Sequence, residues 1–107
     1  MLWYFYVIYF FAGGFLANGV PHFVNGISGR KFPTPFAHPP GIGLSSPTVN
    51  VLWGFTNFVV GSLLLTIIGS FSLGLTFDTL VAILGALAIS LFSSRVFGKL
   101  KKNRNTY

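Results

Sequence analysis

Residues 47–68 read PTVNVLWGFTNFVVGSLLLTII and contain no charged side chain. Ser46 stands directly before this stretch, and serine is a preferred N-cap residue because its hydroxyl accepts from a free backbone N–H group. Pro47 suits the first helical position, where a missing N–H group removes no helical hydrogen bond. Since about 20 apolar residues cross the hydrocarbon core of a bilayer, we predict a transmembrane helix over about 47–69.

A second apolar stretch opens the chain. Residues 2–19 are rich in aromatic side chains and include no Lys or Arg. Asn18-Gly19 followed by Pro21 is typical of a helix stop, since Gly and Asn favour C-caps and Pro cannot continue the hydrogen-bond pattern. We therefore predict that the first transmembrane helix covers about 2–19.

A third apolar stretch follows a short hydrophobic connection. It runs over about 78–97, and either Thr76 or Asp78 can cap its first turn. An acid at a helix N-terminus is stabilised by the helix dipole. We expect Asp78, the single acid of the chain, to stabilise this helix start rather than to act in catalysis.

The composition supports the same fold class. Only 7% of the residues are charged and 52% are hydrophobic, whereas about a quarter of a soluble domain is charged. A soluble protein with so few polar side chains would expose large apolar patches. The sequence therefore predicts an all-α membrane protein with three transmembrane helices, and residues 1–107 form a single integral membrane domain.

The segment between the first two spans differs in character. Residues 21–48 hold all six prolines and both histidines, and glycine and phenylalanine are frequent there. Proline fixes the backbone and removes a donor, so regular structure should be limited to short pieces. We predict a long Pro/Gly/Phe-rich loop over 20–46. Because a flexible linker would leave its aromatic side chains in water, we expect it to be ordered against the helix ends or the membrane interface.

The basic residues give an orientation. Arg30 and Lys31 fall in the predicted loop, and the basic tail over 98–107 follows the third span, on the same side of the membrane. The positive-inside rule makes this side cytoplasmic and places the N-terminus outside. We expect the tail to contact anionic lipid headgroups through Lys99, Lys101, Lys102 and Arg104. A net charge of +6 concentrated at the ends of apolar runs does not indicate nucleic acid.

Small and polar residues form stripes on two of the predicted helices. The second helix has a stripe spaced four, three and four residues apart, and the third has one spaced four apart, so each lies on one helix face. Such stripes either pack the helices against each other or face another protein or another copy of the chain. The residues that we expect to pack helices or to line a pore are Asn50, Gly54, Asn57, Gly61, Ala82, Ala86 and Ser90.

Several classes of chemistry are disfavoured. No ionisable residue lies in the middle of a predicted span, whereas proton-coupled carriers need one at membrane depth. His22 and His38 lack acidic or cysteine neighbours, so they are weak candidates for a metal or haem site. Asp78 is predicted on the other side of the membrane from both histidines, which prevents a Ser/His/Asp triad within one subunit. We predict no catalytic residue, metal or cofactor.

Three loop segments carry a resemblance. Residues 18–29 read NGVPHFVNGISG, residues 32–37 read FPTPFA and residues 45–54 read SSPTVNVLWG. Together they resemble a set of small bacterial inner-membrane proteins with three helices, over about residues 10–61. The resemblance implies a bacterial inner membrane and brings no activity with it.

These observations lead to one functional expectation and two alternatives. We expect a non-enzymatic accessory or scaffold subunit of a larger membrane complex, with membrane lipids and either a membrane-protein partner or copies of itself as neighbours. The first alternative is a homo-oligomeric channel or small uncoupled transporter lined by the Asn50/Asn57 face, and the second is a lipid-acting enzyme that uses His22. Aromatic residues dominate many interfaces, and the partner-contact candidates are Phe23, Phe32, Phe36 and Trp53.

Overall fold

A computed structural model describes residues 3–68 and 71–104 of the chain. It contains the helices α1 (Trp3–Ile27), α2 (Pro47–Thr66) and α3 (Phe77–Arg104), with a small sheet of β1 (Phe32–Pro33) and β2 (Leu44–Ser45). Each of the three helices is long and apolar enough to cross a membrane. The predicted all-helical fold with three candidate spans is therefore confirmed, and the chain is a multi-pass membrane protein.

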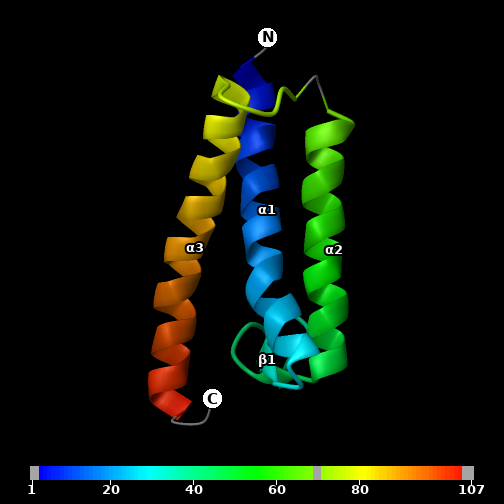
Figure 1. Cartoon of the computed structure of the whole chain (residues 1–107). Helices are drawn as coiled ribbons and strands as arrows, with labels where there is room; N and C mark the ends of the chain where they lie inside the picture. Colours follow the sequence, from blue (N-terminus) through cyan, green and yellow to red (C-terminus); the bar gives the residue numbers. More distant parts are fainter. Residues whose placement is uncertain (1–2, 69–70, 105–107) are drawn as a thin grey trace.

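The first helix occupies the centre of the bundle. α1 packs against both other helices, and α2 and α3 lie on different sides of it (Figure 1). The chain is elongated, with principal extents of 46 × 24 × 22 Å. The loop after α1 and the C-terminal end of α3 lie at one end of the molecule, and the start of α1 lies at the other (Figure 1). Contacts made by α1 therefore hold the fold together.

α1 is longer than the sequence predicted. It continues to Ile27 with Pro21 inside it, so the prediction of a helix end near Gly19 is wrong; residue 2, the predicted start, lies outside the described residues. Pro21 has no N–H group to donate within the helix. However, Gly19 is buried against α2, and this packing continues the helix past the local stop signal.

The true end of α1 has its own local cause. Gly29 has a φ of +75°, a left-handed conformation that glycine adopts without strain. The backbone N–H group of Arg30 donates to the carbonyl oxygen of Asn25 at 2.9 Å, which closes the last turn. Gly29, rather than Gly19, therefore supplies the left-handed residue after the helix.

The start of α2 matches the prediction closely. Ser46 is the N-cap, its hydroxyl accepts from the backbone N–H group of Val49 at 3.1 Å, and Pro47 is the first helical residue. The helix extends to Thr66, and residues 69–70, where we predicted its end, lie outside the described residues.

α3 begins as predicted and ends later. The hydroxyl of Thr76 accepts from the backbone N–H group of Thr79 at 3.2 Å, so Thr76 caps the helix. Asp78 is buried in the first turn, and its carboxylate accepts from the backbone N–H group of Ser72 at 3.0 Å, in the connection before the helix. The predicted end near Phe97 is wrong, since the helix continues to Arg104. Basic side chains favour a helix C-terminus, where they meet the negative end of the dipole.

The segment between α1 and α2 comprises residues 28–46, shorter than the predicted 20–46 because α1 is longer. β1 pairs with β2 in antiparallel register, with Phe32 opposite Ser45. The hydroxyls of Thr34 and Ser45 lie 2.5 Å apart and are both buried. The ring of Phe32 packs on that of Phe97 in α3, with centroids 4.6 Å apart. This segment therefore folds against the helix ends, as expected from its aromatic residues.

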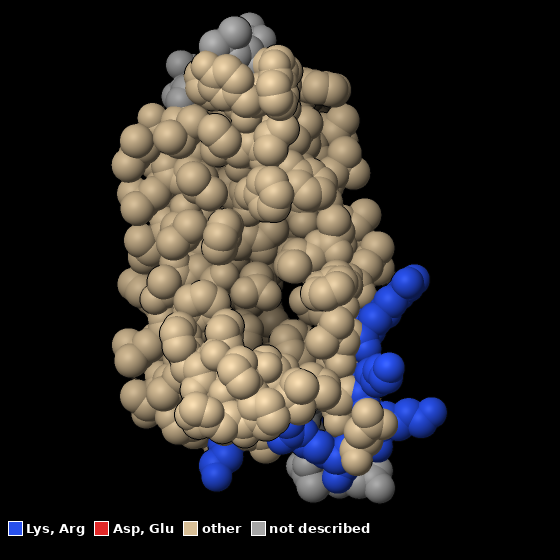
Figure 2. Space-filling model, turned by 180° about the vertical axis from the view of Figure 1, so that it is seen from behind, with Lys and Arg blue, Asp and Glu red and all other residues tan. Residues whose placement is uncertain are grey.

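Charge is distributed unevenly along the long axis. The Lys and Arg side chains gather toward the end that carries the loop and the end of α3 (Figure 2). Asp78 lies in the first turn of α3, at the other end of that helix. The loop and tail cations thus share one end of the molecule.

Candidate functional site

The stripe on α2 lies against α1 within the same chain. Asn50, Gly54, Asn57 and Gly61 are the buried residues of α2. A Cβ atom added to Gly54 would lie 2.7 Å from the backbone nitrogen of Phe23. One added to Gly61 would lie 2.9 Å from the carbonyl oxygen of Ala12. The contacts therefore support the helix-packing alternative for this stripe.

The stripe on α3 divides into two parts. Near the start of the helix, Gly85 contacts the backbone of Phe10, and Gly13 of α1 contacts the backbone of Ala82. Ala82 and Ala86 are half-buried there. Ser90 is exposed one turn later, and its hydroxyl donates to the carbonyl oxygen of Ala86 at 2.6 Å. Only the first half of this stripe packs on α1.

A buried polar pair joins α1 to α2 near the loop. The side-chain nitrogen of Asn50 donates to the carbonyl oxygens of Phe32 at 3.0 Å and Ser46 at 3.1 Å. Its side-chain oxygen must therefore face Nδ1 of His22, 2.9 Å away, and that nitrogen carries a proton. His22 is 3% exposed, and its ring also packs on the ring of Phe32. This pair fastens the loop and both helices together.

A second polar pair lies two turns further along α2. Nδ2 of Asn57 donates to the carbonyl oxygen of Trp53 at 2.8 Å, so its Oδ1 faces α1. That oxygen accepts from Nδ2 of Asn18 at 3.1 Å. Because the Trp53 carbonyl can only accept, it determines which end of the Asn57 amide faces α1 and, through Asn57, which end of the Asn18 amide faces α2. Oδ1 of Asn18 is therefore turned away from α2.

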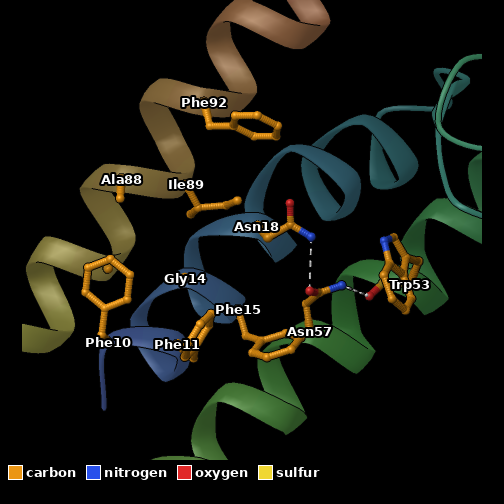
Figure 3. Close-up of a pocket in the computed structure, with 11 residues that line it drawn as sticks. Phe10, Phe11, Gly14, Phe15, Asn18, Trp53, Asn57, Ala88, Ile89 and Phe92 are labelled. Atoms are coloured by element: carbon orange, nitrogen blue, oxygen red, sulfur yellow. Dashed lines mark hydrogen bonds between the residues drawn. The ribbon is translucent and has the colours of Figure 1, made fainter. Parts of the chain in front are cut away.

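A lateral pocket opens beside this pair, between α2 and α3 with α1 at its floor (Figure 3). Its volume is about 370 Å³. Most of its lining is aromatic or small and apolar, and Asn18 and Asn57 are its polar residues. The pocket is lined by Phe10, Phe11, Gly14, Phe15, Asn18, Trp53, Asn57, Gly85, Ala88, Ile89 and Phe92.

A basal hollow of about 400 Å³ lies nearer the loop, between α1 and the second half of α3. Ser90, Ser93 and Ser94 line its α3 side, and Pro21 lies on its α1 side. Because the second half of the α3 stripe contributes to this hollow, small residues there are accessible from outside the bundle.

The four aromatic partner-contact candidates have different surroundings. Phe32 is 7% exposed and therefore packs inside the chain. Phe23 belongs to α1, and its ring packs on that of Phe58, 5.6 Å away. Phe36 is 62% exposed and touches Trp53, with ring centroids 5.2 Å apart. Phe36 is the member of this set that offers most of its surface to a neighbour.

The remaining candidates lie at the basic end. Lys99, Lys101 and Lys102 are exposed on the last turns of α3, and Arg104 is half-buried. His38 is exposed in the loop, whereas His22 is buried in α1. Over residues 3–68 and 71–104, no group of three or more His, Cys, Asp or Glu side chains could hold a metal ion.

Sequence reasoning missed the roles of Asn18 and His22. Asn18 was interpreted as part of a helix stop, and His22 as a loop residue. They lie four positions apart, which places them on one helix face once α1 is known to continue past Pro21. Asn50 and Asn57 on α2 likewise lie on one helix face. Because α1 and α2 are antiparallel, Asn18 pairs with Asn57 and His22 pairs with Asn50.

Comparisons of this chain with protein-family models, with curated proteins and with solved structures find no match.

Proposed function

We propose that this chain is a non-enzymatic accessory or scaffold subunit of a larger membrane protein complex. The observation that carries the proposal is the incomplete use of α3. Its first half packs on α1 through Gly85, whereas Ser90, Ser94 and Gly98 are exposed, and nothing lies within 4 Å of a Cβ added to Gly98. In lipid, exposed small residues at four-residue spacing allow another helix to approach closely.

The basal hollow supports the same proposal. Ser90 and Ser94 line it, and Val20 on its α1 side is half exposed. A partner side chain inserted there would contact both helices at once. Phe36 adds an exposed aromatic ring at the same end of the molecule. A partner helix on α3 and a partner surface on the loop would therefore bind to neighbouring parts of the chain.

The proposal includes an orientation of the chain in the membrane. All the loop and tail cations share one end, and the positive-inside rule makes that end cytoplasmic and leaves the N-terminus outside. The sequence resemblance favours the inner membrane of a bacterium.

Cysteine labelling tests this orientation. The chain has no cysteine, so a cysteine introduced at one position is the only thiol that a maleimide can label. Leu73→Cys should react with an impermeant maleimide in intact cells and Ser28→Cys only after lysis; the reverse pattern would refute this orientation.

The channel alternative gains no support from the α2 stripe. Asn50 and Asn57 are 0% and 1% exposed, and their side-chain oxygens are bonded to His22 and Asn18 of α1 in the same chain. The alternative of an enzyme that uses His22 has no acid beside it: the described partners of that side chain are Asn50 and aromatic rings.

The test is purification of the tagged chain from its native membrane in mild detergent, with native sizing and mass spectrometry. We expect a stoichiometric second protein that is lost from the Ser94→Leu variant and retained with Thr56→Val, an exposed position on α2. Phe36→Ala should weaken recovery if the loop also contacts the partner. A discrete homo-oligomer without a second protein, or equal recovery with Ser94→Leu, would overturn the proposal.

A further inference from the structure

The lateral pocket has the size and position of a ligand site. Its volume of about 370 Å³ lies within the range of about 300–1,000 Å³ that is usual for small-molecule pockets. It opens sideways from the bundle along spanning segments, and Phe11 and Phe15 at its edge are exposed. In a membrane this opening faces the acyl chains, so the pocket is accessible to a molecule dissolved in the bilayer.

One polar atom is directed into this apolar space. Oδ1 of Asn18 points away from Asn57, on the side of Ile89 and Phe92 (Figure 3). Among the hydrogen bonds between described residues, Asn18 takes part through its side-chain nitrogen, and none is made to its side-chain oxygen. An unsatisfied acceptor is costly in lipid, where no water replaces the missing donor. The atom therefore favours a ligand that brings an O–H group.

A donor stands nearby. The indole N–H group of Trp53 makes no hydrogen bond to a described residue, and its nitrogen lies on the side of the ring toward Asn18 (Figure 3). The ring of Phe36 packs against that of Trp53, with centroids 5.2 Å apart. A ligand with two hydroxyl groups can donate to Oδ1 of Asn18 through one and accept from the indole N–H group through the other. The remaining walls are aromatic, which suits a flat ring.

We propose that the lateral pocket binds a membrane-dissolved lipid whose headgroup is a flat phenolic ring of the hydroquinone type. The ring lies among Phe10, Phe15 and Phe92, its hydroxyl bonds to Asn18, and its tail extends into the bilayer. The observation that selects this ligand over an acyl chain is the free acceptor in an aromatic pocket. The inference does not depend on the accessory role, because it concerns a different surface from the basal hollow.

The experiment observes Trp53 directly. The chain has two tryptophans, so a Trp3→Phe parent labelled with 5-fluorotryptophan gives one fluorine resonance. In phosphatidylcholine nanodiscs it is titrated with decylhydroquinone and, separately, with the dimethyl ether of that molecule. We expect a saturable shift with decylhydroquinone and at least about tenfold weaker binding of the ether, because the ether cannot donate to Asn18.

Variants locate the site. Asn18→Leu should remove the preference for the hydroquinone over its ether. Ala88→Phe adds an aromatic ring to the α3 wall of the pocket and leaves Asn18 and Asn57 in place. It should abolish the saturable shift, and it keeps the test decisive if Asn18→Leu fails to fold. Ser90→Ala, in the basal hollow, should bind like the parent. Equal affinity for both ligands, a shift that never saturates, or unchanged binding by Ala88→Phe would overturn the proposal.

Discussion

At the scale of single residues, buried amides do more than fill space. Asn50 is fully buried and its side chain bonds to His22 on α1 and to the carbonyl oxygens of Phe32 and Ser46. Removing the amide takes away the bond to Nδ1 of the buried His22 and the side-chain donor to the carbonyl oxygen of Phe32. A buried polar atom left without a partner costs about 1–3 kcal/mol.

We predict that Asn50→Leu lowers the free energy of unfolding by about 2–4 kcal/mol, because leucine cannot bond to His22 or to the loop carbonyls. Unfolding in mixed micelles by titration with a denaturing detergent measures this change. Thr56→Val is the control, since the hydroxyl of Thr56 is exposed and donates to the carbonyl oxygen of Leu52 in its own helix. A similar loss in both variants would contradict the role assigned to Asn50.

The sequence predicts those features of the site that depend on neighbouring residues, and not those that depend on how the helices pack. The stripe of Asn50 and Asn57 was visible from spacing alone, because helix periodicity fixes a shared face. Their partners were not, because Asn18 and His22 join that face only if α1 passes Pro21. The lateral pocket depends on how three helices are placed, which no local pattern of residues determines.

At the scale of helices, packing agreed with the local signal for the start of α2 and overrode the local stop signal in α1. The start of α2 was correct because Ser46 and Pro47 act within a single turn. The end of α1 was wrong because Gly19 and Gly26 allow close contact with α2 beyond the proline. A Cβ added to Gly26 would lie 2.6 Å from a side-chain carbon of Val51. Contacts of this kind are made only in the assembled bundle.

We predict that Gly54→Ala destabilises the protein by about 1–3 kcal/mol, since the added methyl group forces α1 and α2 apart. A Cβ there would lie 2.7 Å from the backbone nitrogen of Phe23. Gly98→Ala is the matched control, because its Cβ would meet nothing within 4 Å. That variant should gain up to about 1 kcal/mol from helix propensity. Thermal unfolding in detergent should separate the two, and equal stabilities would contradict this packing.

At the scale of the whole molecule, the chain is a bundle arranged around α1, with its cations at one end and its lateral pocket between α2 and α3. The polar stripe of α2 is buried against α1 inside the chain, whereas Ser90 and Ser94 in the second half of α3 are exposed. This asymmetry is the basis for proposing an accessory subunit rather than a pore formed by copies of the Asn50/Asn57 face.

The choice between an accessory subunit and a pore depends on whether the α2 stripe faces α1 of its own chain. Cross-linking of cysteines tests this most directly. Asn18→Cys and Asn57→Cys are introduced together into this cysteine-free chain and treated in native membranes with a short bis-thiol-reactive bimane, which becomes fluorescent on joining two thiols. We expect a fluorescent product at the mobility of the monomer, and no dimer from Asn57→Cys alone. Dimers formed by the single Asn57→Cys variant, with no fluorescent monomer from the double variant, would contradict it.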